Sequence, residues 1–486
     1  MNSNKGYKSL GTNALLNAIK SSLSIIFPLV TYPYIFRVLH AEGVGKFTYA
    51  NSIVSYFSLL AVLGINTYAV REGAKLREDK KKVEVFINQL FTINIISTVI
   101  AYILLFALLF FTNFLSNYKD IIFVLSLTML FTTLSADWIN TIYEDFLIIT
   151  LRSIAIYAIS LILIFVLIRD DEDVLLYSFI TVFSGLITCL MNRIYCKRYA
   201  RIRLTKTINY QTHLPPILFF FINNIAVNIY VNSDTTMIGY MIGDYYVGLY
   251  SIAVRIYSVI KALLAALYLA TIPRLSSYIG SGEKEKFKST FSNIVSLLSL
   301  VLLPASIGLI MVSKEIILIF GGTEYLASIT TLRILSISLI GAIAGGAITM
   351  CLNVPFGYER INMYATMLSC IINVGLNFWL IPNMKQDGAA ITTAISEFFV
   401  AIFCIINNKE IKDCIDLIMV KRNLKDSLIG CITVACVSFF VRRFVSSGII
   451  KPLVTVVSAS IVLYIIELIL SKNVFIIRIL HKRIKT

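Results

Sequence analysis

The stretch "LSADWINTIYEDFLIITLRS" (residues 134–153) places Asp137, Glu144, Asp145 and Arg152 between two long apolar runs. Each flanking run is long enough to cross a membrane, so the charged centre predicts a hairpin that turns near Glu144 and Asp145. Asp137 and Arg152 each lie about seven residues from this turn, which is roughly 10 Å at 1.5 Å per residue. We therefore expect these two side chains at matching depth on neighbouring antiparallel helices.

The composition indicates an integral membrane protein. The chain has 486 residues, of which 58% are hydrophobic and 14% are charged, and its mean hydropathy is +0.82. Soluble domains carry charge on roughly a quarter of their residues. The apolar runs are too long for the strands of a membrane barrel, so we predict an all-α polytopic membrane protein.

Apolar runs separated by polar breaks predict about 14 transmembrane helices. The candidate spans are 12–36, 44–68, 84–112, 120–142, 146–168, 174–195, 215–241, 245–272, 289–312, 325–353, 361–382, 388–407, 426–446 and 450–471.

The net charge of +16 is explained by orientation in the membrane and does not indicate nucleic acid as a partner. If both termini are cytoplasmic, 29 of the 43 basic residues fall in cytoplasmic segments and about eight in outer loops. This asymmetry predicts the orientation, because positive residues are retained on the cytoplasmic side. The segment 441–451, with Arg442, Arg443 and Lys451 outside, is an exception.

Six basic residues remain within or at the edges of spans: Lys20, Arg37, Arg152, Arg255, Lys261 and Arg333. Each is unfavourable by about 2.5–3.5 kcal/mol if it faces lipid at the centre of the bilayer. A polar interior lined by such cations would select anions, and a pyrophosphate would suit several of them. Snorkelling and ion pairing are the alternative explanations for each one.

An internal repeat relates the two halves of the chain. A shift of 203 residues aligns "VGKF" (44–47) with "VGLY" (247–250) and places Arg71 on Arg274. We therefore predict two parallel six-helix lobes around a central cleft, followed by two additional helices. The predicted domains are 1–200, 201–412 and 413–486, the last including a basic cytoplasmic tail.

Polar side chains recur at helical spacing in three spans, which predicts faces that line the cleft. They are Asn13 and Asn17 in the first span, Tyr49, Ser52 and Tyr56 in the second, and Asn224 and Asn228 in the seventh, where Asp234 continues the stripe. Hydrogen bonds that hold the helices together are the alternative for each residue.

Other chemical signals are weak. The eight cysteines form no Cys-x-x-Cys motif and the three histidines are far apart, so we expect free thiols, no metal site and no bound cofactor. No cleavable signal peptide is expected at the N-terminus, because no small-residue cleavage site follows a short apolar core. "GVGKFT" (43–48) lacks the first glycine of a phosphate-binding loop, so ATP hydrolysis is not expected.

Several longer segments resemble one family. "PYIFRVLHAEGVGKFTYANSIVSYFSLLAVLGINTYAVREGAK" (33–75), "ADWINTIYEDFLIITLRS" (136–153), "NSDTTMIGYMIGDYYVGLYSIAVRI" (232–256) and "DGAAITTAISEFFV" (387–400) are similar to signatures of the polysaccharide flippases. These belong to the multidrug/oligosaccharidyl-lipid/polysaccharide exporter superfamily.

The resemblance implies a transporter and not an enzyme. It implies movement of an oligosaccharide repeat unit, linked to polyprenyl pyrophosphate, from the cytoplasmic to the outer leaflet of a bacterial cytoplasmic membrane by alternating access. The product would serve capsule, O-antigen or related surface polysaccharide, with a polysaccharide polymerase and glycosyltransferases as partners. It also implies coupling to H⁺ or Na⁺ at a membrane-embedded acid, for which Asp137, Asp234 and Glu397 are the candidates by position.

Two other functions compete with this interpretation. A cation-coupled multidrug exporter of the same superfamily usually has twelve spans and would favour an acidic cavity. A membrane enzyme acting on lipid-linked sugars would need a sizeable outer loop, whereas the predicted outer loops are mostly about five to ten residues long.

The pair at the hairpin has two interpretations. A charge pair between Asp137 and Arg152 would lower the insertion penalty of both. Alternatively, Arg152 meets the substrate pyrophosphate at the cytoplasmic entrance, while Asp137 holds Arg152 in place or replaces the substrate after its release. The matching turn of the second lobe, "NVPFGYERIN" (353–362), has no acid that corresponds to Asp137, which favours a functional role.

Overall fold

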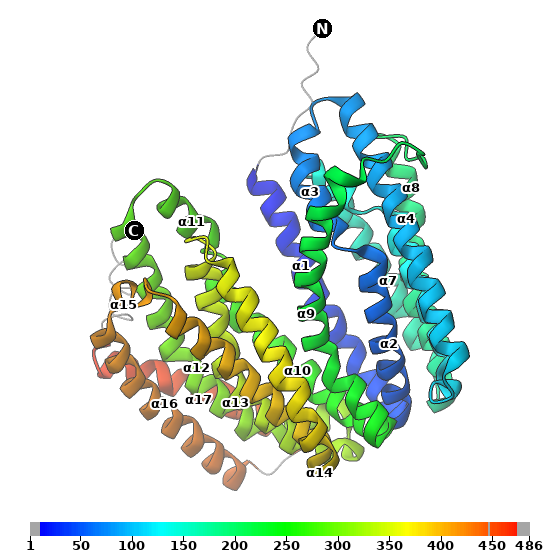
Figure 1. Cartoon of the computed structure of the whole chain (residues 1–486). Coiled ribbons are helices and arrows are strands. Elements are labelled where there is room, and N and C mark those ends of the chain that lie inside the picture. Colours follow the sequence, from blue (N-terminus) through cyan, green and yellow to red (C-terminus); the bar gives the residue numbers. More distant parts are fainter. Residues whose placement is uncertain (1–9, 446–447, 474–486) are drawn as a thin grey trace. The chain divides into compact units, whose positions relative to one another are not determined.

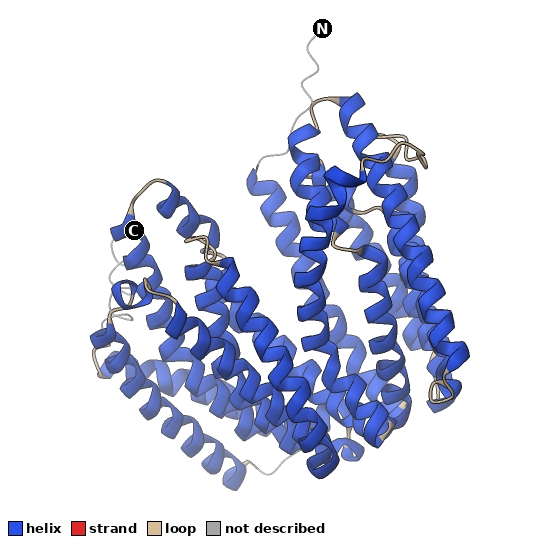
Figure 2. Ribbon diagram, viewed as in Figure 1, coloured by secondary structure: helices blue, strands red, loops and turns tan. Residues whose placement is uncertain are grey.

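A computed structural model describes residues 10–445 and 448–473, apart from the side chains at 10–15, 17, 18 and 223. Helices and the loops between them make up this described part, and no strand occurs in it (Figure 2). The residues cluster into two compact units, Met1–Thr236 and Met237–Thr486. Each unit is described separately below.

The first unit is a bundle of long helices (Figure 1). Here α1 packs on α7, α2 on α4 and α5, and α5 on α8. Its elements are α1 (Leu10–Val38), α2 (His40–Val62), α3 (Ile65–Leu76), α4 (Lys80–Phe111), η1 (Ser116–Tyr118), α5 (Lys119–Ser135), α6 (Trp138–Ile142), α7 (Phe146–Leu167), η2 (Asp171–Asp173), α8 (Val174–Cys196) and most of α9 (Tyr210–Ile242).

The second unit is also a bundle of long helices. Here α10 packs on α13, α12 on α13, and α13 on α14, while α16 and α17 pack on each other and on α12. Its elements are α10 (Asp244–Leu269), α11 (Ile272–Gly280), α12 (Lys284–Gly321), η3 (Thr323–Ala327), α13 (Ser328–Ile348), the π-helical turn η4 (Thr349–Asn353), α14 (Glu359–Asn407), α15 (Ile411–Cys414), α16 (Leu417–Phe444) and α17 (Ile450–Leu470).

The predicted number of spans is confirmed. In the described part of the chain, 13 helical segments are long and apolar enough to cross a membrane. One of them, α14, has 49 residues, which is about 70 Å of helix against a hydrocarbon core of about 30 Å. A kink with non-helical backbone at Lys385 divides α14 into two arms, which correspond to the predicted spans 361–382 and 388–407.

The division between the units differs from the predicted division between the lobes. The predicted second lobe begins with the seventh span, which is α9, whereas α9 clusters with the first unit as far as Thr236. The central cleft and the domain boundaries stay predictions.

The apolar residues serve two different environments. In α7, Leu151, Ile154 and Ile162 are exposed on the surface of the bundle, as expected of residues that face lipid. One end of the first unit instead has a buried core that joins α3, α4, α6 and the start of α9 and includes Tyr68, Trp138 and Ile217. This core fixes the helix ends among which the hairpin 134–153 lies.

The hairpin has the predicted form. The chain leaves α5 through Ala136, whose φ of 46° is in the left-handed region, and enters α7 after Glu144, whose φ is 54°. The short helix α6 fills the space between these two breaks. The two spans therefore run antiparallel, with Asp137 before the turn and Arg152 after it.

The segment that links α8 to α9 is held against α4. The backbone N–H of Arg203 donates to Asn88 Oδ1 at 2.8 Å, and that of Thr205 donates to Thr92 Oγ1 at 3.0 Å. Gln89 Nε2 donates to the carbonyl oxygen of Thr207 at 3.0 Å. These bonds satisfy backbone groups that have no partner in a regular element.

Candidate functional site

Asp137 and Arg152 form the expected ion pair. Arg152 Nη2 lies 2.9 Å from Asp137 Oδ1 and 3.1 Å from Oδ2. The Arg152 side chain is 4% exposed, whereas that of Asp137 is 43% exposed. A guanidinium buried to this degree requires acceptors, because an unpaired buried charge is strongly unfavourable. The predicted proximity is confirmed, and the pair satisfies the arginine inside the first unit.

Two asparagines complete this pair, and no sequence pattern predicted their role. Arg152 Nη1 donates to Asn192 Oδ1 at 3.0 Å, and Asn140 Nδ2 donates to the same oxygen. Asn192 in turn donates from Nδ2 to the carbonyl oxygen of Ser135 at 2.6 Å. The network therefore joins α5, α6, α7 and α8, and both asparagines are fully buried.

The acidic side chains at the tip of the hairpin bind other elements. Glu144 forms an ion pair with Arg77 at 2.7 Å, which attaches the tip to the segment after α3. Asp145 accepts hydrogen bonds from the hydroxyls of Tyr199, at 2.6 Å, and Tyr195. Burial and the hydrogen bond to the Asp145 carboxylate raise the pKa of Tyr199, so this hydroxyl remains a donor at neutral pH. The hairpin charges thus hold the end of the first unit together.

The corresponding turn of the second unit contains asparagines but no ion pair in the described structure. Asn408 Nδ2 donates to Asn353 Oδ1, Asn353 Nδ2 donates to Asn362 Oδ1 at 2.6 Å, and Asn362 donates to the Thr349 carbonyl at 3.2 Å. Asn353 ends the π-helical turn after α13, and Asn408 directly follows the second arm of α14; both are buried, as Asn140 and Asn192 are in the first unit. The asparagine contact is repeated, and the Asp137–Arg152 pair is added to it in the first unit.

A second ion pair, between a partly exposed lysine and a buried glutamate, lies in the second unit. Lys261 Nζ of α10 lies 2.6 Å from Glu397 Oε1 of α14, and the hydroxyl of Tyr257 donates to the same oxygen at 3.4 Å. The Lys261 ammonium is also 5.6 Å from the centre of the Tyr257 ring, a cation–π contact. Two of the six predicted anion-binding cations are therefore paired with two of the three predicted coupling acids.

The other four predicted cations lie on α1, α10 and α13. Arg333 is exposed, and its Nε donates to Ser313 Oγ at 3.1 Å. Arg37 is exposed at the end of α1. Lys20 and Arg255 are half-buried on α1 and α10.

The predicted polar stripes have a meeting point that the sequence did not reveal, Thr236 of α9. Its hydroxyl lies 2.9 Å from Ser52 Oγ and 3.1 Å from the Tyr56 hydroxyl, so it joins α9 to α2. Asp234, two residues earlier, is 4% exposed. These bonds match the structural alternative for Ser52 and Tyr56.

The remaining stripe residues lie in different surroundings. Tyr49 is buried against the Tyr118 ring, 4.9 Å away, so it packs inside the first unit and lines no open surface there. Asn228 accepts a hydrogen bond from Asn232 through its backbone oxygen at 3.1 Å, and Asn224 is half-buried. The side chains of Asn13 and Asn17 fall outside the described residues.

Comparison with known structures defines the class of this fold. A structure of the lipid II flippase MurJ, in an inward closed conformation, is 17% identical and aligns over 95% of this chain and 99% of its own with a TM-score of 0.73. An inward-facing multidrug resistance MATE family transporter of the MOP superfamily is 14% identical and aligns over 79% of this chain and 96% of its own with a TM-score of 0.57. The chain therefore has the all-helical MurJ/MATE fold, which confirms the predicted all-α membrane protein.

Sequence comparison then identifies the family. A family model described as "Polysaccharide biosynthesis protein" matches residues 10–279, and one described as "MatE" matches residues 220–379. A protein of Escherichia coli (strain K12) described as "Putative O-antigen transporter" is 24% identical over 84% of this chain and 99% of its own length. The chain belongs to the polysaccharide biosynthesis protein family, which confirms the resemblance noted from its motifs.

Proposed function

We propose that this chain flips an oligosaccharide repeat unit, linked to polyprenyl pyrophosphate, from the cytoplasmic to the outer leaflet. The observation that carries the proposal is the family match over residues 10–279, together with similarity along nearly the whole Escherichia coli O-antigen transporter relative. The fold supports it, because the MurJ structure that aligns over 95% of the chain is described as a lipid II flippase. The chain is a multi-pass membrane protein, and we place both termini in the cytoplasm of a bacterial cell.

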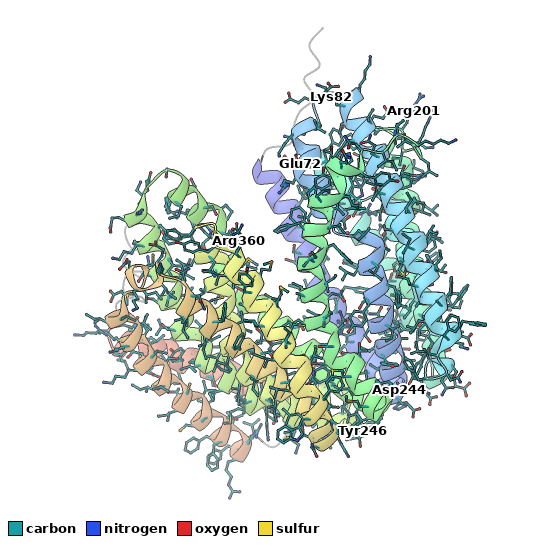
Figure 3. The ribbon with its side chains drawn as sticks, in the orientation of Figure 1. Glu72, Lys82, Arg201, Asp244, Tyr246 and Arg360 are labelled. Carbon is teal, nitrogen blue, oxygen red and sulfur yellow. The ribbon has the colours of Figure 1, made fainter. Side chains whose placement is uncertain are left out.

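The substrate would be recognised through its pyrophosphate by basic side chains within or at the edges of the spans. The candidates are Lys20, Arg37, Arg152, Arg255, Lys261 and Arg333, of which Arg152 and Lys261 each form an ion pair with a carboxylate. Arg255→Gln should lower the transport rate on the order of tenfold, because one charge-assisted bond to phosphate is lost. Arg360→Gln, at an exposed position near one end of the second unit (Figure 3), should leave it unchanged.

Coupling to H⁺ or Na⁺ is proposed for Asp234. Its carboxyl is buried on α9, beside the Thr236 contact with α2, and an acid buried within a span is a candidate for binding a coupling cation. Asp234→Asn should abolish or strongly reduce transport without loss of expression. Asp120→Asn, at an exposed position in the first turn of α5, is the matched control and should transport normally. Full activity of Asp234→Asn would remove this residue from the coupling role.

A cation-coupled multidrug exporter is the second candidate. The "MatE" match to residues 220–379 and the aligned multidrug transporter structure favour it. The polysaccharide family match covers more of the chain, and it includes all of α1 to α8.

A cellular experiment separates the two candidates. Deleting the gene should remove a surface polysaccharide, cause its lipid-linked repeat unit to accumulate in the cytoplasmic leaflet, and leave drug susceptibility unchanged. Intact surface polysaccharide together with increased drug susceptibility would favour the exporter. We further propose that glycosyltransferases supply the substrate and that a polymerase consumes the flipped product.

A further inference from the structure

A basic hollow on the first unit is separate from the buried network of Asp137 and Arg152. It has a volume of about 500 Å³ and is formed by the last turn of α8 and the linker that follows. Four of its six lining residues are cationic and none is acidic. The lining residues are Arg193, Lys197, Ala200, Arg201, Ile202 and Arg203.

The charge in this hollow is not neutralised by the described part of the chain. None of its four cations forms an ion pair there. Arg193 stacks its guanidinium on the Phe91 ring, 5.0 Å from the ring centre, and its Nη1 is buried without a hydrogen-bond acceptor. The other three cations, Lys197, Arg201 and Arg203, are exposed and accessible to an anionic ligand from outside the chain.

The linker that carries two of these cations is fixed in place. Its backbone at Arg203 and Thr205 is bonded to the α4 side chains of Asn88 and Thr92. Arg201 and Arg203 are consequently held beside the end of α8 and do not move as a free loop. Arg201 lies at the same end of the first unit as Lys82, which the charge distribution places on the cytoplasmic side (Figure 3).

An apolar surface borders the hollow. Leu190 and Ile194 of α8 are 56% and 71% exposed, and Leu204 of the linker is 65% exposed. Arg193 and Lys197 each follow one of the two α8 residues by three positions, so the cationic and apolar rows adjoin on the helix surface. A ligand with a phosphate and a hydrocarbon chain would meet both rows at once.

We propose that this hollow binds the phosphate of an anionic glycerophospholipid in the cytoplasmic leaflet. The guanidinium and ammonium groups bind the phosphate oxygens, and the acyl chains lie along Leu190 and Ile194. A free phosphate would use the cations but would leave the apolar row unused. The site is independent of the proposed transport function, because it takes a lipid of the membrane and not the cargo.

The test uses the full-length protein purified in a zwitterionic detergent. Native mass spectrometry measures binding of phosphatidylglycerol, phosphatidylcholine, inorganic phosphate and undecaprenyl pyrophosphate. The unmodified protein should bind phosphatidylglycerol most tightly. A triple variant with Lys197→Gln, Arg201→Gln and Arg203→Gln should bind it on the order of a hundredfold more weakly, from the contribution of three basic residues near an anionic surface. Arg193 is retained because it packs on Phe91.

The matched control removes the same charge elsewhere in the first unit. A variant with Lys80→Gln, Lys81→Gln and Lys82→Gln, all exposed at the start of α4, should bind phosphatidylglycerol as the unmodified protein does. If the triple variant in the hollow does not fold, the exposed Arg201→Gln alone should weaken binding about fivefold.

Three results would overturn the proposal. Equal weakening by the two triple variants would show that only diffuse positive charge attracts the lipid. Equal binding of inorganic phosphate at the same concentration would show that the acyl chains contribute nothing. Binding of undecaprenyl pyrophosphate without phosphatidylglycerol would assign the hollow to the cargo.

Discussion

Arg152 is bonded simultaneously to Asp137, through Nη2 at 2.9 Å, and to Asn192, through Nη1 at 3.0 Å. Asn192 cannot easily turn its amide toward position 152, because its Nδ2 donates to the Ser135 carbonyl. The environment of Arg152 therefore presents acceptors only. The acid and the cation therefore cannot exchange positions: the cation must lie on α7 and the acid before α6.

This arrangement predicts the result of a charge swap. Asp137→Ala should destabilise the protein by about 1–3 kcal/mol. Removing one partner of a fully buried ion pair costs about 3–5 kcal/mol, and the expected loss is smaller here because the Asp137 side chain is partly exposed. The double variant Asp137→Arg with Arg152→Asp should not recover this loss, because the new carboxylate faces the Asn192 oxygen. Thermal unfolding in detergent measures both. Full recovery of stability and transport would show that charge neutralisation alone is required.

The repeated asparagine contact predicts similar losses in the two units. Asn192→Ala and Asn353→Ala should each destabilise the protein by about 1–3 kcal/mol, because buried polar partners lose their hydrogen bonds. Asn383→Ala removes an exposed side-chain bond to the Trp379 carbonyl and should change stability by less than about 0.5 kcal/mol. Thermal unfolding midpoints of the three variants measure these differences in stability. A neutral Asn353→Ala would contradict a structural role for the contact in the second unit.

The kink in α14 predicts a strong dependence on one glycine. A Cβ at Gly388 would lie 2.4 Å from the Leu380 carbonyl oxygen across the kink, so Gly388→Ala must displace backbone. We expect a loss of more than about 2 kcal/mol. Gly375→Ala, in the same helix with no atom within 4 Å of the new Cβ, should be neutral or stabilising by up to about 1 kcal/mol. Equal effects in thermal unfolding would show that the two arms do not approach as described.

The docked linker predicts a change in protease sensitivity. A double variant with Asn88→Ala and Thr92→Val removes both side-chain acceptors for the linker backbone and should raise trypsin cleavage at Arg201, Arg203 and Lys206 several-fold. Cleavage near Lys284 and Lys286 in the second unit should stay constant and serves as an internal control. Unchanged cleavage of the linker would show that other contacts hold it.

The helices and the hairpin could be predicted because they depend on local sequence. The lengths of the apolar runs predict the spans. The equal sequence distances of Asp137 and Arg152 from the turn predict that the two side chains lie at the same depth. The polar residues between the two arms of α14 also allowed the arms to be predicted as separate spans. The structure joins these arms in one kinked helix.

The partners of the candidate site residues could not be predicted in the same way. Asn192 completes the Arg152 site from a helix 40 residues away, and Glu397 reaches Lys261 across 136 residues. Which helices are neighbours, and how each is rotated, decides these contacts, and neither property is encoded in the spacing of residues within one span. For the same reason, six cations that looked alike in sequence differ in burial, from Arg152, which is buried in an ion pair, to Arg333, which is exposed.

The central claim is that this chain flips a polyprenyl-pyrophosphate glycan, and translocation in proteoliposomes tests it most directly. Purified protein is reconstituted with a fluorescent lipid-linked oligosaccharide, and the fraction accessible to a membrane-impermeant quencher is followed over time. We predict that the accessible fraction rises faster than in protein-free vesicles, and that Asp234→Asn removes the difference while Asp120→Asn does not. Translocation no faster than in protein-free vesicles, with any repeat unit carried on polyprenyl pyrophosphate, would contradict the claim.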